Sequence, residues 1–174
     1  MKKFIAIFFC LFLVGGLIFL GTRETESSHT EYLRIHIRAD SNSAVDQDIK
    51  YIIKDQIVDF LTPVISSCTT KDEFEEKINQ NLSQITRIAN EILAHNNLDY
   101  RSSAKLTNEY FPVRTYGNLT LDSGYYDALI VNLGSGKGDN WWCVVYPPLC
   151  FVNSNTTYVY KSRLLETIRK FFGG

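Results

Sequence analysis

The spacing of apolar residues changes partway along the chain, and this change constrains the fold more than any other feature. From Ala44 to Ala94 apolar residues recur at steps of three and four, whereas from Ala104 to Val159 β-branched and aromatic residues dominate, with Gly and Asn between them. The first spacing is typical of helices with one buried face, and the second is typical of strands. From Tyr32 to Ile37 apolar and polar residues alternate, which predicts a strand before the helices. The order predicts a single α+β domain with helices on one face of a mostly antiparallel sheet.

Two central helices and a C-terminal helix are expected. The first runs from Ala44 to Leu61, and Pro63 ends or kinks it. Thr70 and Glu73 fit a capping box for a second helix from Lys71 to Ala94. An apolar face also predicts a final helix from Ser162 to Phe172.

The second half predicts a meander of strands. An extended stretch over 105–116 is interrupted near Pro112, and the Gly117 turn leads to a short extended piece over 119–121. A strand over 126–133 is then expected to return through a glycine-rich hairpin, residues 134–138, into a strand over 141–145.

The amino-terminal segment contains an apolar run from Phe4 to Leu20 that follows Lys2 and Lys3. Its length lies between that of a cleaved signal peptide and that of a spanning helix, so residues 1–21 are a signal peptide or a signal anchor. Both alternatives place the rest of the chain outside the cytoplasm, because positive charge stays inside. Residues 22–31 are predicted as a polar tether, and residues 32–174 as the folded domain.

Charge and motifs exclude several classes of function. The chain has 18 Lys and Arg against 19 Asp and Glu, so it lacks the basic excess of a nucleic-acid-binding protein. The glycine-rich stretch 134–138 leads into a strand instead of a helix, so it is not a phosphate-binding loop. No metal-ligand spacing is present, and no cofactor is expected.

Cys143 and Cys150 allow two interpretations. In an exported domain they could form a disulfide that closes a short loop, or they could be two buried free thiols. An alternative function, an exported cysteine hydrolase acting on cell wall or peptide, would use Cys143 as nucleophile and His36 as base.

Aromatic residues are dense near the end of the predicted sheet. Adjacent strand residues point to opposite faces, so either Trp141 or Trp142 must be exposed or covered by another element. An exposed aromatic cluster is typical of a protein–protein hot spot. The candidate partner-binding residues are Trp141, Trp142, Tyr146 and Phe151.

Three blocks resemble the stage II sporulation protein R family. They are LRIHIRADSNS at 33–43, YDALIVNLGSGKG at 126–138 and NWWCVVYPPLCFV at 140–152. Arg38 and Asp40 depart from the pattern, since the family more usually has an aliphatic residue and Asn there.

The resemblance implies a signalling protein of endospore-forming bacteria that is not itself an enzyme. Such a protein is made in the forespore and exported into the space between the forespore and mother-cell membranes, where it could stay anchored to the forespore membrane. There it would activate a membrane-embedded aspartic protease of the mother cell. That protease processes the precursor of sigma factor E.

Overall fold

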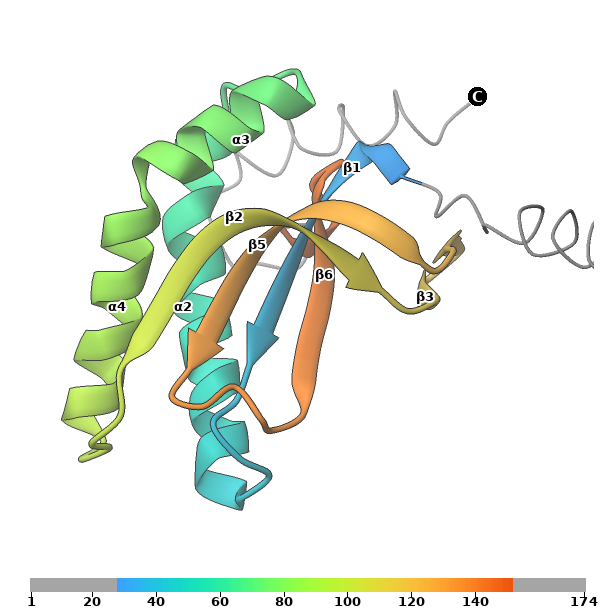
Figure 1. The fold of residues 1–174 in the computed structure, drawn as a ribbon. Helices are drawn as coiled ribbons and strands as arrows, with labels where there is room; N and C mark the ends of the chain where they lie inside the picture. The colour runs from blue at the N-terminus through green and yellow to red at the C-terminus, as the bar shows by residue number, and fades with distance from the viewer. Residues whose placement is uncertain (1–27, 152–174) are drawn as a thin grey trace, which may run out of the picture.

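The computed structural model describes residues 28–151, and side chains are described over 31–150. Figure 1 shows how the elements are arranged. In chain order they are β1 (Ser28–Arg38), α2 (Ala44–Ile65), α3 (Lys71–Gln80), α4 (Leu82–His95), β2 (Ser102–Phe111), β3 (Arg114–Tyr116), β4 (Leu119–Leu121), β5 (Gly124–Leu133), β6 (Asn140–Tyr146) and the 3-10 turn η1 (Leu149–Phe151).

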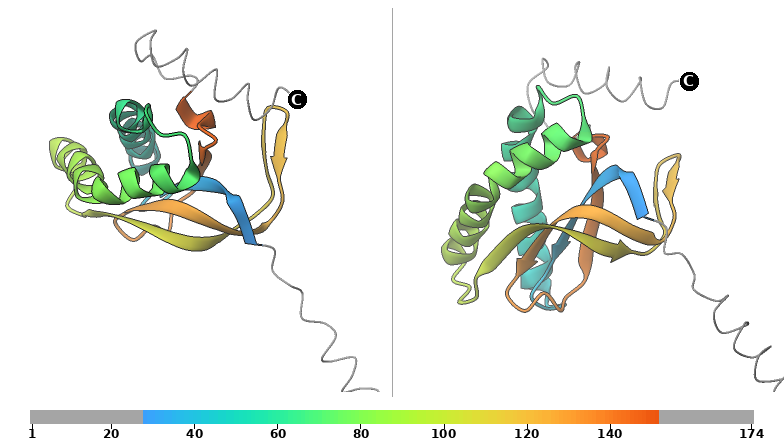
Figure 2. Two further views of the ribbon diagram at one scale, coloured as in Figure 1. Left: turned by 90° about the horizontal axis from the view of Figure 1, so that it is seen from above. Right: turned by 45° about the horizontal axis from the view of Figure 1, so that its top comes forward.

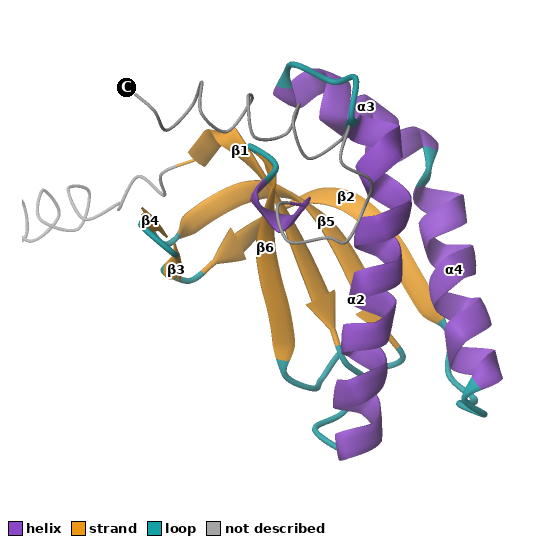
Figure 3. Cartoon of the chain, turned by 180° about the vertical axis from the view of Figure 1, so that it is seen from behind, coloured by secondary structure: helices purple, strands orange, loops and turns teal. Residues whose placement is uncertain are grey.

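A four-stranded sheet in the order β2-β5-β1-β6 forms the centre of the fold. β1 pairs with β5 in parallel and with β6 in antiparallel orientation, and β2 pairs with β5 in antiparallel orientation. The helices cover one face of this sheet (Figure 3). The core lies between them, where Leu33, Ile35 and Ile37 of β1 pack with the buried stripes of the three helices.

The opposite face, called the polar face below, is partly covered by a second, two-stranded sheet. β3 and β4 pair only with each other, so they form a separate hairpin. Figure 2 shows this hairpin on the side of the molecule away from α4. Tyr116, Leu119 and Leu121 of the hairpin pack there with Phe111 and Tyr126 in a second apolar cluster.

Local side-chain bonds fix where the helices begin and break. The Ser43 side chain accepts a hydrogen bond from the Asp46 amide at the start of α2, and Thr70 and Glu73 form the expected capping box of α3. The predicted second helix is divided at Asn81, which lacks helical dihedral angles and separates α3 from α4. α2 continues past Pro63 to Ile65, four residues beyond its predicted end at Leu61.

The glycine-rich stretch 134–138 is a tight connection that interlocks with the turn after β1. The Gly138 amide donates to the Ala39 carbonyl at 2.9 Å, and the Ser135 hydroxyl donates to the Asp40 carbonyl at 2.9 Å. A Cβ on Gly138 would collide with the Ser41 backbone, so this approach requires glycine.

The prediction of an α+β domain with helices on one face is confirmed, but the predicted hairpin between β5 and β6 is wrong. β5 and β6 do not form a hairpin, because β1 lies between them. The sheet is mixed: the β2–β5 and β1–β6 pairs are antiparallel, as expected for most of the sheet, and the β1–β5 pair is parallel. Strand β1 begins at Ser28, inside the stretch predicted as a tether. The amino-terminal segment 1–21 and the predicted C-terminal helix lie outside the described residues. Within residues 28–151, no helix has the length and apolar character needed to cross a membrane.

Candidate functional site

Trp141 and Trp142 lie on opposite faces of β6, as the alternation of strand side chains requires. Trp141 packs against the core on the helix side, with the Lys54 ammonium 5.7 Å from its ring centre. Trp142 lies on the polar face, stacked on His36 at 5.1 Å and covered by the Arg114 guanidinium at 4.0 Å. Both rings are half-buried. The structure therefore covers each tryptophan with a cation from another element and leaves an edge of it accessible.

The other two predicted anchors lie elsewhere. Tyr146 is only 7% exposed; its ring meets Phe74 edge-on at 5.0 Å and its hydroxyl donates to the Thr69 carbonyl at 3.3 Å. Its side chain contributes to the core, so its replacement would test folding more than partner contact. Phe151 closes η1, and its side chain lies outside the described ones.

The structure joins Cys143 and Cys150 by a disulfide with a Cα–Cα distance of 5.9 Å. Cys143 faces the helix-side core, whereas His36 lies on the polar face with Trp142 and Phe111. The hypothesis of a Cys143–His36 catalytic pair is therefore wrong, because the sheet itself separates the two side chains and the thiol is oxidised. A nucleophile and its base must lie within hydrogen-bonding reach.

A charged cluster on the polar face surrounds Glu109 of β2. His36 Nδ1 lies 3.1 Å from Glu109 Oε1, and Arg38 forms an ion pair with the same carboxylate. Arg38 also donates to the Asn132 side chain at 3.4 Å. Burial, together with the nearby Arg38 charge, lowers the pKa of His36, so the imidazole is neutral at neutral pH. The Glu109 carboxylate thus interacts with both His36 and Arg38.

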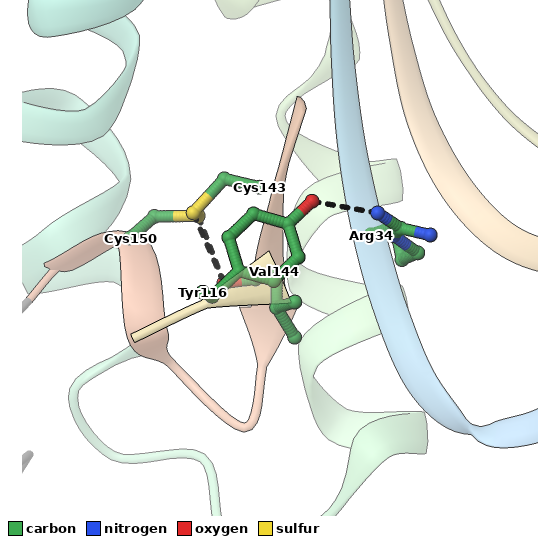
Figure 4. The surroundings of a disulfide bond; sticks show 5 residues. All are labelled: Arg34, Tyr116, Cys143, Val144 and Cys150. Atoms are coloured by element: carbon green, nitrogen blue, oxygen red, sulfur yellow. Dashed lines mark hydrogen bonds between the residues drawn. A yellow bond between two sulfur atoms is a disulfide. The ribbon is translucent and has the colours of Figure 1, made fainter. Parts of the chain in front are cut away.

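Arg34 lies beside this cluster in an aromatic enclosure, here called the Arg34 cage. Its guanidinium carbon is 4.1 Å from the ring centre of Phe111, 4.7 Å from that of Tyr126 and 5.7 Å from that of Tyr116. Nη2 donates to the Tyr116 hydroxyl at 2.6 Å, as Figure 4 shows. Cation–π contact of this kind favours a desolvated guanidinium. The cage consists of Arg34, Phe111, Tyr116 and Tyr126.

Sequence reasoning missed the Arg34 cage for an identifiable reason. Arg34 and His36 occupy the polar positions of an alternating strand, which normally face water. The structure buries both, because the hairpin folds back over this face. The signal that could have found them is the aromatic content of the segment 110–126, since Tyr and Phe side chains provide a wall suited to a buried cation.

Across the described part of the chain, no group of three or more His, Cys, Asp or Glu is placed to hold a metal ion. The polar face instead combines half-buried Trp142 with three arginines, Arg34, Arg38 and Arg114. Aromatic and arginine side chains are the residues most enriched at protein–protein hot spots.

Comparison with known proteins gives the family of the chain. The family model for stage II sporulation protein R matches residues 29–156, which include every strand of the main sheet except the first residue of β1. Stage II sporulation protein R of Bacillus subtilis (strain 168) is 33% identical over 181 residues, covering 98% of this chain and 81% of that protein. No solved structure matches. The chain therefore belongs to the stage II sporulation protein R family.

Proposed function

We propose that this chain is an exported signal of endospore formation that activates a membrane-embedded aspartic protease of the mother cell. The protease then processes the precursor of sigma factor E. The single observation that carries the proposal is membership of the stage II sporulation protein R family over nearly the whole chain.

The proposed location is the space between the forespore and mother-cell membranes. The apolar run Phe4–Leu20 follows Lys2 and Lys3 and supports export. Whether it acts as a cleaved signal peptide or as a signal anchor, the residues after it would lie outside the cytoplasm. An anchored form would remain on the forespore membrane and present the domain outward. The disulfide between Cys143 and Cys150 fits a location outside the reducing cytoplasm.

Activation without chemistry requires a difference in affinity. A ligand shifts an equilibrium only by binding one state better than the other, so the domain must bind the active arrangement of the protease more tightly than the inactive one. A tenfold shift requires about 1.4 kcal/mol of differential binding. Contacts by Trp142 and Trp141 are our proposed source of that difference, with Trp142 preferred because it lies among charged side chains on the polar face.

The test is complementation of precursor processing. This chain is expressed in the forespore of a sporulating strain that lacks its own stage II sporulation protein R, and maturation of the sigma factor E precursor is followed by immunoblotting. We expect processing with the unchanged chain, and no processing when the protease is deleted. Absence of processing by a chain that is expressed and exported would refute the proposed function.

A matched pair of variants tests the proposed contact surface. Trp142→Ala should strongly reduce processing, whereas Thr120→Ala on the exposed outer side of the hairpin should leave it unchanged. Both purified proteins are first compared by thermal denaturation to show that they fold. Normal processing by a Trp141→Ala, Trp142→Ala double variant would remove the tryptophans from the interface while leaving the proposed function intact.

A further inference from the structure

Among residues 31–150, whose side chains the structure describes, Arg34 forms no ion pair with a carboxylate. The side chain is 0% exposed, and its Nε and Nη1 atoms are buried without a hydrogen-bond acceptor. In the part of the chain that the structure describes, its hydrogen bond goes to the Tyr116 hydroxyl. A buried charge that lacks a counter-charge is costly, so such a group needs a compensating role.

The neighbouring charges make this deficit larger. Arg114 lies close enough to Arg34 that, together with the dominant effect of burial, it lowers the pKa of the Arg34 guanidinium. Glu109, the carboxylate of the adjacent cluster, is already shared by His36 and Arg38. Among the described residues, no ion pair therefore balances the charge of Arg34, and its buried Nε–H and Nη1–H groups lack an acceptor.

The part of the cover over Arg34 that carries Tyr116 is a short hairpin outside the main sheet. β3 and β4 are three residues each and share no backbone pairing with the main sheet. A two-stranded hairpin of this size is marginally stable alone, so it depends on side-chain contacts such as the bond from Arg34 to Tyr116. Displacement of the hairpin would remove the Tyr116 hydroxyl from Arg34, and another acceptor could then enter the cage.

The chemistry of the cage selects the acceptor. One unmatched guanidinium between aromatic rings balances a single negative charge, which fits a carboxylate better than a doubly charged phosphate group. The walls of the cage are the rings of Phe111, Tyr116 and Tyr126. Aromatic walls of this kind favour a carboxylate carried between apolar side chains.

We propose that Arg34 receives the carboxylate of an acidic side chain from a protein partner, which enters the Arg34 cage when the β3–β4 hairpin lifts from the sheet. Assigning this carboxylate to the protease rests on the proposed function; the binding site itself does not. Tyr116 acts as a placeholder that satisfies one N–H group of Arg34 until the partner arrives.

The test uses nuclear magnetic resonance of the full-length chain, labelled with ¹⁵N in a neutral detergent. The probe is an acetylated and amidated Leu-Glu-Phe tripeptide, and the matched control is the Leu-Gln-Phe tripeptide. The Nε–H resonance of Arg34 is identified by its loss in Arg34→Lys. We expect a saturable shift of this resonance with the Glu peptide and none with the Gln peptide.

The Tyr116→Phe variant keeps the ring but removes the competing hydroxyl. It should bind the Glu peptide about tenfold more tightly, the change that corresponds to the net effect of one hydrogen bond to a charged group. If Arg34→Lys fails to fold, Tyr116→Phe can identify the Arg34 Nε–H resonance instead. Loss of the bond to the Tyr116 hydroxyl should shift that resonance relative to the unchanged chain.

Three results would overturn the inference. They are no saturable shift with the Glu peptide, an equal shift with the Gln peptide, and tighter binding of inorganic phosphate than of the Glu peptide. The measurement needs neither the protease nor sporulating cells. A failure of peptide binding with normal precursor processing therefore refutes the carboxylate site alone, and the reverse result refutes the proposed function alone.

Discussion

Reduction of the Cys143–Cys150 bond should lower the stability of the domain by a predictable amount. The two cysteines are separated by seven positions, and closing a loop of that size removes about 2.5 kcal/mol of unfolded-state entropy at 25 °C in the chain-entropy model. For a domain of this size, each 1 kcal/mol shifts the melting temperature by about 2–4 °C, so the expected loss is about 5–10 °C. The bond also joins η1 to the middle of β6, so the loss should be accompanied by loosening of η1.

Scanning calorimetry with and without a phosphine reductant measures this loss, and intact mass reports the oxidation state of each sample. A Cys143→Ala, Cys150→Ala double variant is the control, because its melting temperature should not respond to reductant. Cys68 is free and buried, so it does not contribute a second reducible bond within the described residues.

Two results would contradict this reasoning. One is an unchanged melting temperature on reduction when the mass shows that the bond has been broken. The other is a mass of the unreduced protein that shows two free thiols at these positions, since the loop would then never have been closed.

Three further perturbations follow from the fold. Gly138→Ala should destabilise the domain by about 3 kcal/mol in denaturant titrations, because the added Cβ would collide with the Ser41 backbone. Gly117→Ala should cost only about 1 kcal/mol, because its Cβ has no neighbour and the cost comes from the positive φ alone. Because the pKa of His36 is lowered in the folded state, the unfolded chain takes up the proton first, and stability should fall as pH drops below about 6.5, by up to about 1.4 kcal/mol per pH unit; His36→Gln should flatten this dependence in melts across pH. Thr70→Ala should cost about 1 kcal/mol in thermal denaturation, since it removes the side-chain bond to the Glu73 amide, and an unchanged melting temperature would show that the capping box contributes nothing.

Local features of the fold could be predicted from the sequence because their causes are local. The capping box at Thr70 and the interruption of the extended stretch at Pro112 both depend on residues within a few positions of each other. The division of the second helix at Asn81 was missed, because the apolar spacing continues across it and only the backbone angles of that residue reveal the break.

The arrangement of the strands depends on contacts between distant residues, which no local pattern contains. The glycine-rich stretch 134–138 looked like a hairpin turn, yet its bonds go to Ala39 and Asp40, and β1 occupies the space between β5 and β6. The same applies to the candidate site. The alternation of β1 identified Arg34 as outward-facing, but only the return of the hairpin over that face encloses it.

The central position of β1 has a consequence for the order of events during export. β1 leads the described chain, but its two neighbours come about a hundred residues later, since Leu33 pairs with Asp127 on one side and Tyr146 on the other. A chain exported amino terminus first, as proposed above, would carry its central strand across the membrane without either partner. In that case β1 would lack its pairing partners until residue 146 had crossed, so the main sheet would not form before then. Under the proposed function, the signalling domain would be complete only once nearly all of it had been delivered.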